Sequence, residues 1–113
     1  MLELRNSAHY TLLAEQFRMD ESDPFYQLIN DSLKRFFDFI YHYTDLVFID
    51  FIDESTIYEY IRYHKKTGFK HVSFQQVIKD VKAFLFFLKY IKNKKHVPPV
   101  DLSLKNYSLW ARL

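Results

Sequence analysis

The chain has 113 residues, enough for one ordinary domain, and 19% of them are aromatic, with twelve Phe and nine Tyr. One Gly and three Pro are too few turn residues for a small sheet-rich domain, and the absence of Cys excludes disulfides and thiolate chemistry. The net charge is only +2, yet residues 1–56 carry four basic against eleven acidic residues, and residues 57–113 carry twelve against three. We therefore expect one all-α domain over residues 1–113. Its basic half would face an anionic partner, unless the two halves pair with each other.

The chain shows no apolar run near the roughly 20 residues of a membrane span. Its first ten residues, MLELRNSAHY, lack the apolar stretch of a secretory signal peptide. We therefore expect a cytoplasmic protein that makes no contact with a membrane.

A first short helix is expected near residues 6–19, capped by Asn6 or Ser7. Its apolar face would consist of three side chains: Leu12, Leu13 and Phe17.

A longer helix is expected over residues 24–44. Asp23 can cap this helix, and Pro24 suits the first helical position, where no N–H donor is needed. Apolar side chains recur at helical spacing along it, at Phe25, Ile29, Leu33, Phe36, Ile40 and Tyr43.

Residues 45–53, DLVFIDFID, could form a buried strand or a connector whose apolar side chains enter the core. We favour the connector, with a short helical turn in it, because no second strand candidate exists to pair with. A third helix should follow over residues 54–66, with Asp53 as its cap and Gly68 as its left-handed end. One face of that helix would hold Ile57, Tyr60, Ile61 and His64.

The fourth and most apolar helix is expected over residues 73–95. Ser73 and Gln76 have the spacing of a capping box. The apolar stripe runs through Phe74, Val77, Val81, Phe84, Leu88 and Ile91. Prolines then impose an extended chain, and we expect the tail, residues 100–113, to dock on the helices or on a partner.

Catalytic and metal-binding patterns are missing from the sequence. None of the five His lies three or four residues from another, as a helical metal site would need. A single Gly makes a P-loop, a dinucleotide-binding motif and a nucleophile elbow impossible. We therefore expect a protein that is not an enzyme and holds no metal or cofactor.

Binding remains, and basic residues of the second half are its candidates. Lysines mixed with aromatic residues suit a phosphate backbone or an acidic protein surface, although they also serve simply to solubilise helix edges. The candidate binding residues are Arg62, Lys65, Lys66, Lys70, Lys79, Lys82, Lys89 and Lys92, together with Trp110 in the tail.

The order of elements resembles the SAM-like core-binding domain of tyrosine recombinases and phage integrases. The resemblance runs through SLKRFFDFIYHYT (32–44), FIDFIDESTIYEYIRYHKKTG (48–68) and the helix from Ser73 to Leu88. It implies a small helical bundle that grips DNA. The catalytic domain of that family has no counterpart in the sequence.

A closer resemblance is to the swarming motility protein SwrA family of bacilli, over roughly residues 32–110. Its most specific part is DLSLKNYSLW (101–110), similar to the D-x-S-L-x-N-x-x-L-W ending of that family. This resemblance implies a non-enzymatic regulator of flagellar and swarming genes. Such a protein acts with a DNA-binding response regulator of the DegU type at promoter DNA and is a substrate of regulated Lon proteolysis.

Three functions therefore stand as hypotheses. The first is a transcriptional co-regulator that binds a response regulator. The second is a stand-alone core-binding domain that contacts DNA directly. The third is a structural module that forms homo-oligomers, because exposed aromatic residues also favour self-association.

Overall fold

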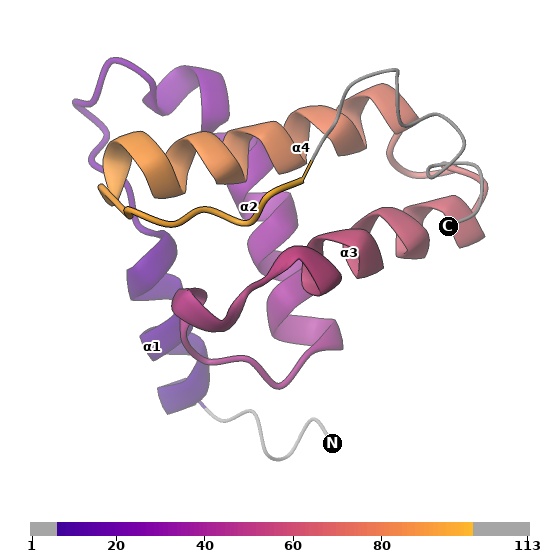
Figure 1. The fold of residues 1–113 in the computed structure, drawn as a ribbon, viewed down its shortest axis with the longest axis horizontal. Coiled ribbons are helices and arrows are strands. Elements are labelled where there is room, and N and C mark those ends of the chain that lie inside the picture. The colour runs from indigo at the N-terminus through magenta and orange to yellow at the C-terminus, as the bar shows by residue number, and fades with distance from the viewer. Residues whose placement is uncertain (1–6, 101–113) are drawn as a thin grey trace.

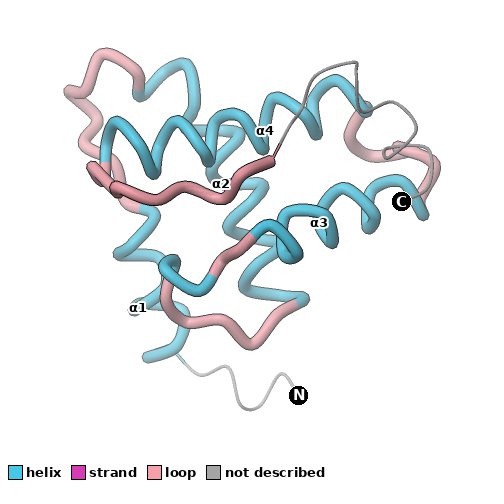
Figure 2. Tube along the Cα trace, viewed as in Figure 1, coloured by secondary structure: helices cyan, strands magenta, loops and turns pink. Residues whose placement is uncertain are grey.

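The computed structural model describes residues 7–100, which form four α-helices and no strand (Figures 1 and 2). The elements are α1 (Ser7–Phe17), α2 (Tyr26–Tyr43), the 3-10 turn η2 (Ile49–Phe51), α3 (Glu54–Lys66), α4 (Phe74–Phe86) and the π-helical turn η3 (Phe87–Ile91). The predicted all-α fold class is confirmed. No helix among these residues is long and apolar enough to cross a membrane.

Helix α4 is the central element. It passes across α2 and packs against both α2 and α3, while α1 packs against α2 and η2 (Figure 1). After η3 the chain turns back and runs extended beside α4 through Pro98 and Pro99 (Figure 1).

The core is built largely from stacked and crossed aromatic rings. Phe36 of α2 and Phe84 of α4 are both fully buried, with ring centroids 4.4 Å apart. Phe17 of α1 stacks on Phe84 at 5.7 Å, and Tyr60 of α3 meets Phe36 edge-on at 5.0 Å. All four helices thus contribute a ring to one cluster, which explains how a short chain fills its core.

Two helix starts and one helix end agree with the sequence. Asp53 caps α3 by accepting a hydrogen bond from the Thr56 amide at 3.0 Å, and Ser73 caps α4 through the Gln76 amide at 3.1 Å. Gly68 has φ +68°, the left-handed conformation expected after α3. The predicted apolar face of α3, Ile57 to His64, is buried.

The predicted start of α2 is wrong by two residues. The helix begins at Tyr26, and a tight turn precedes it, closed by a 3.0 Å hydrogen bond from the Tyr26 amide to the Asp23 carbonyl. The Asp23 carboxylate accepts a hydrogen bond from the Phe25 amide at 2.8 Å, the kind of bond that a capping residue makes, but it does so within this turn. The predicted α1 face also needs a correction, since Leu13 and Phe17 are buried but Leu12 is exposed.

The predicted end of the fourth helix, near residue 95, is wrong as well. Regular α-helix stops at Phe86, and a π-helical turn continues only to Ile91, closed by a 2.9 Å hydrogen bond from the Lys92 amide to the Phe87 carbonyl. Asn93 then takes a left-handed φ of +54°, which ends the helix. The expected docking of the tail at 100–113, with Trp110, falls almost wholly outside the described residues.

The segment 45–53 is a connector with one short helical turn, as the sequence predicted. Gln16 of α1 fixes its backbone: the side-chain amide donates to the Val47 carbonyl at 2.6 Å and accepts from the Ile49 amide at 2.9 Å. Ile49 of η2 and Ile52 directly after it are buried, whereas Phe48 and Phe51 are exposed.

Candidate functional site

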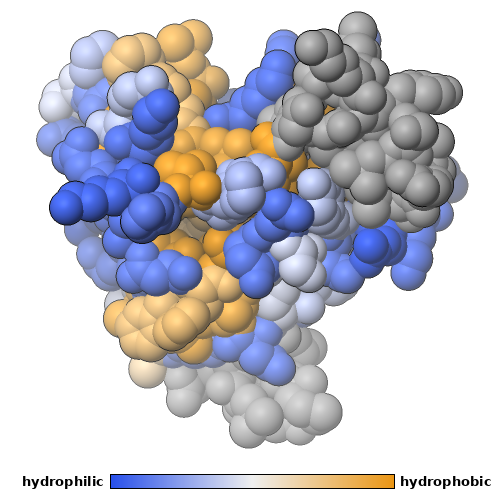
Figure 3. Space-filling view, in the orientation of Figure 1, coloured by the Kyte–Doolittle hydropathy of each residue, from blue (hydrophilic) through white to orange (hydrophobic). Residues whose placement is uncertain are grey.

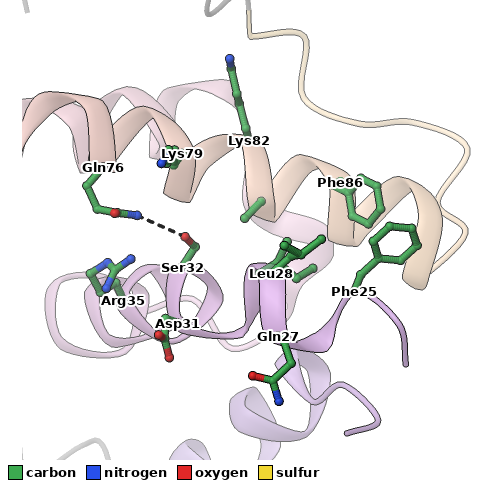
Figure 4. Close-up of a pocket in the computed structure, with 12 residues that line it drawn as sticks. Phe25, Gln27, Leu28, Asp31, Ser32, Arg35, Gln76, Lys79, Lys82 and Phe86 are labelled. Carbon is green, nitrogen blue, oxygen red and sulfur yellow. Dashed lines mark hydrogen bonds between the residues drawn. The ribbon is translucent and has the colours of Figure 1, made fainter. Parts of the chain in front are cut away.

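A groove of about 570 Å³ lies between α2 and α4 (Figure 4). We call it the α2–α4 groove. From left to right in Figure 4, the wall formed by α2 presents Arg35, Ser32, Leu28 and Phe25, and the wall formed by α4 presents Gln76, Lys79, Lys82 and Phe86. The remaining lining residues are Gln27, Ile29, Asp31 and Ala83.

One end of the groove is apolar and open to solvent. Leu28 is 75% exposed and Phe25 is 41% exposed, although both are large apolar side chains at a helix surface. The Phe25 ring meets Phe86 edge-on, with centroids 4.8 Å apart, so the two walls close on each other at this end. An apolar side chain as exposed as Leu28 gains from burial when another molecule covers it.

Two lysines follow one another along the α4 wall. Lys79 and Lys82 are exposed, lie three positions apart and both line the groove, although in Figure 4 the Lys82 side chain extends away from the α2 wall. Within residues 7–100, neither lysine forms an ion pair. Asp31 on the facing wall is the groove's one acidic residue.

A buried carboxylate lies directly beneath the polar end of the groove. Asp80 of α4 is fully buried, and Arg35 of α2 binds it through two hydrogen bonds of 2.9 and 3.0 Å. The Tyr60 hydroxyl of α3 donates to the same carboxylate at 2.6 Å, and Gln76 donates at 2.9 Å. Asp80 therefore joins three helices through four hydrogen bonds, and we call this set the Asp80 network.

The network changes the ionisation of its members. The hydrogen bond from Arg35 to Asp80 raises the pKa of the guanidinium more than burial lowers it. Burial first, and then the hydrogen bond to Asp80, raise the pKa of Tyr60, so this hydroxyl remains a donor. Because Asp80 neutralises Arg35, the positive charge available to a ligand in the groove comes from Lys79 and Lys82.

Gln76 connects the network to the groove surface. Its side chain does not return to Ser73, as a full capping box would require; it donates to Asp80 and, at 3.4 Å, to the Ser32 hydroxyl (Figure 4). Ser32, Arg35 and Gln76 all line the groove, so this part of its wall is held by hydrogen bonds to the core. Such a wall keeps its shape in the absence of a ligand.

The Asp80 network contains groups that can act as acids or bases in an enzyme, but its carboxylate and its tyrosine hydroxyl are not accessible to a substrate. Asp80 and Tyr60 have no exposed surface, and the neighbouring His64 is 9% exposed, with its ring 4.8 Å from that of Tyr60. Burial lowers the pKa of His64, partly opposed by the charge of Asp80. The described residues contain no group of three possible metal ligands.

No family model, curated protein or solved structure matches the chain. The resemblances to the SwrA family and to recombinase core-binding domains therefore stay predictions.

The other predicted binding residues lie outside the α2–α4 groove. Arg62 and Lys66 line a separate hollow of about 510 Å³ beside Tyr43 and Tyr63, where Arg62 is paired with Glu59. Lys70 is exposed in the turn after α3, and Lys65, in the last turn of α3, is only partly exposed.

Lys89 and Lys92 contact aromatic rings of their own turn. The Lys89 ammonium lies 5.3 Å from the Tyr90 ring, and the Lys92 ammonium lies 5.6 Å from the Phe87 ring. Lys92 also lines a polar hollow of about 810 Å³, whose wall includes three acidic residues, Glu15, Asp20 and Glu21. The structure thus brings together two pairs of the predicted set at surfaces that include apolar side chains, Lys79 with Lys82 in the α2–α4 groove and Arg62 with Lys66 in the hollow beside Tyr43. Of these, Arg62 is already paired with Glu59, and Trp110 lies outside the described residues.

A second apolar surface lies over α1 and η2, at the lower left of Figure 3. Its exposed members are Leu12, Phe48 and Phe51, of which Phe51 is 65% exposed. Asp50 borders it and is paired with Lys94 at 2.8 Å.

Sequence reasoning missed Arg35, Asp80 and Leu28. Asp80 carried a detectable signal, because it lies three positions after Val77 and four before Phe84, within the apolar stripe of α4. A charged residue at such a position must be paired inside the fold. Leu28 gave no such signal, since only the packing of α4 shows that it stays exposed.

Proposed function

We propose that this protein is a non-enzymatic transcriptional co-regulator that binds a DNA-binding response regulator through the α2–α4 groove. One observation carries the binding site: an open apolar groove is edged by Lys79 and Lys82, which form no ion pair in residues 7–100. The Asp80 network supports the proposal because it fixes the wall against which a partner would pack.

The groove suits a protein surface better than a DNA backbone. Leu28 and Phe25 present apolar area at one end, and phosphates offer nothing to cover it. Affinity for DNA comes largely from the number of phosphates that Lys and Arg neutralise, and within residues 7–100 this groove offers only two unpaired lysines for that purpose. Acidic side chains on an otherwise apolar partner satisfy both features.

The identity of the partner comes from the sequence. The ending DLSLKNYSLW resembles the SwrA family, which implies a DegU-type response regulator, flagellar promoter DNA and turnover by Lon. The co-regulator would then reach promoter DNA through its partner.

A gel-shift experiment with flagellar promoter DNA tests this function. The protein should shift the DNA only, or far better, when the response regulator is present. The variant Lys79→Glu/Lys82→Glu should abolish the effect and keep the helical circular dichroism of the wild type, because both side chains are exposed.

The matched control is Lys34→Glu/Lys95→Glu, which changes the charge equally at two exposed lysines outside the groove. It should behave as the wild type. Binding to promoter DNA alone, with a steep loss of affinity as salt rises, would contradict the proposal and favour a direct DNA-binding domain.

A further inference from the structure

We infer that the α2–α4 groove takes a short amphipathic helix of the partner, with two carboxylates one turn apart beside an apolar stripe. This inference rests on the proposed function in one respect, the use of the same groove. It adds the secondary structure, the charge and the spacing of the bound segment.

The shape of the groove supports a helical ligand. Its α2 wall extends from Phe25, the residue directly before the helix, to Arg35, ten residue steps that correspond to about 15 Å at the rise of an α-helix. Helix α4 crosses α2, and the groove opens between the walls that the two helices form at this crossing (Figure 1). An amphipathic helix can lay its apolar face into such a groove. Leu28 and Phe25 would contact that face, and the ring contact of Phe25 with Phe86 closes the groove at its apolar end.

The charges of the groove set the position of the acidic groups. Lys79 and Lys82 are three residues apart, a rise of about 4.5 Å along α4, which matches carboxylates at positions i and i+3 or i+4 of a second helix. Asp31 lies on the opposite wall and would repel a carboxylate placed there (Figure 4). The acidic edge of the ligand must therefore lie toward α4 and its apolar edge toward α2.

Segments of this chain do not offer such a ligand. Residues 101–113 contain Asp101 against Lys105 and Arg112, and residues 1–6 contain Glu3 against Arg5, so neither segment has two carboxylates one turn apart. The acidic connector 45–53 is bound by Gln16, and its exposed rings lie on a 3-10 turn of three residues. The occupant is accordingly a segment of another protein.

Fluorescence anisotropy with designed peptides tests the inference on the full chain. The probe is a fluorescein-labelled helical peptide of about 16 residues, long enough for four turns. Leucines form one stripe, and two glutamates flank it at i and i+4. A second peptide carries the same residues with the glutamates on the opposite face, and a third carries lysines in their place.

The first peptide should bind the wild type at least tenfold more tightly than either of the others. Lys79→Glu/Lys82→Glu should lose that preference and bind the lysine peptide instead, whereas Lys34→Glu/Lys95→Glu should keep it. Leu28→Ala should weaken binding of the first peptide without changing its preference over the lysine peptide. Equal affinity for the first and second peptides, or an unchanged preference in the groove variant, overturns the inference.

The two proposals fail in different ways. A protein that enhances the promoter shift of the response regulator but does not bind the first peptide contradicts the helical ligand and leaves the function standing. A protein that binds the peptide but never affects the regulator contradicts the function alone. Dimers that light scattering detects in the wild type and not in the groove variant would make a second copy the occupant, which also overturns the inference.

Discussion

The two sides of α4 differ in the burial and pairing of their charged side chains. Asp80 points inward, has no exposed surface and accepts four hydrogen bonds from Arg35, Tyr60 and Gln76. Lys79 and Lys82, one position before and two positions after it, point outward and form no ion pair within residues 7–100. The charge of Asp80 is neutralised within the fold and helps to hold α2, α3 and α4 together, whereas the charges of Lys79 and Lys82 remain available to a partner.

This difference separates stability from binding along a single helix. A change in the Asp80 network should alter the free energy of unfolding, and a change at the lysines should alter affinity only. The groove depends on both, because Arg35 and Gln76 belong to the network and also line its wall.

The largest expected effect comes from breaking the buried pair. Arg35→Ala should lower the free energy of unfolding by about 3 kcal/mol, because it leaves the Asp80 carboxylate buried without its cation. Urea denaturation measures this. Arg62→Ala is the matched control at a partly exposed pair and should change the value by less than about 1 kcal/mol; equal losses in the two variants would show that burial of Asp80 does not matter.

A smaller effect is expected from the Tyr60 hydroxyl. Tyr60→Phe keeps the ring contacts and removes the 2.6 Å hydrogen bond, so it should lower stability by about 1–2 kcal/mol at neutral pH. The pKa of Tyr60 is raised in the folded protein, so its contribution is complete below the unfolded pKa of about 10 and is lost as pH rises above it. The difference between wild type and Tyr60→Phe should therefore shrink between pH 10 and 11; a constant difference would argue against the hydrogen bond.

His64 should make the fold sensitive to mild acid by a still smaller amount. Its pKa is lowered in the folded protein, mainly by burial, so the unfolded chain binds the extra proton first. Stability should therefore fall as pH drops below about 6.5, the pKa of an unperturbed histidine. Melting temperatures of the wild type and of His64→Gln between pH 5 and 7 test this, since the variant should lose that part of the pH dependence.

The smallest effect on stability is expected at the groove lysines. Lys79→Glu/Lys82→Glu should leave the free energy of unfolding within about 0.5 kcal/mol of the wild type per substitution, because both side chains are exposed. The same variant should lose partner binding. A large loss of stability would place these lysines in the architecture and remove the contrast between the two sides of α4.

The sequence predicts the helices because apolar spacing and caps are local properties. Asp53, Ser73 and Gly68 mark helix ends through hydrogen bonds or backbone angles that involve only nearby residues. The start of α2 and the end of α4 were harder, because a tight backbone turn over residues 23–26 and a left-handed Asn93 occupy positions that fit the helical pattern of the sequence. These are also local effects, but they depend on geometry that residue types alone do not determine.

The sequence predicts the charged residues of the candidate site but not the groove that lies beside them. Lys79 and Lys82 stand out as charges on an apolar helix, but their connection with Leu28 and Phe25 depends on how α2 and α4 pack. The pairing of Asp80 with Arg35 joins residues 45 positions apart and requires the tertiary fold. Local patterns therefore identify the charged edge, and only the packing of the helices shows the groove beside it.

The most direct test of the central claim is an amide chemical-shift map of the full chain titrated with the acidic amphipathic peptide. We predict that the perturbed amides cluster on the α2–α4 groove, around Leu28, Lys79, Lys82 and Phe86, while α3 and η2 stay unchanged. Perturbations centred on Phe48 and Phe51, or on Arg62 and Lys66, would contradict the assignment of the groove as the binding surface. No perturbation at a peptide excess that saturates the anisotropy signal would contradict it equally.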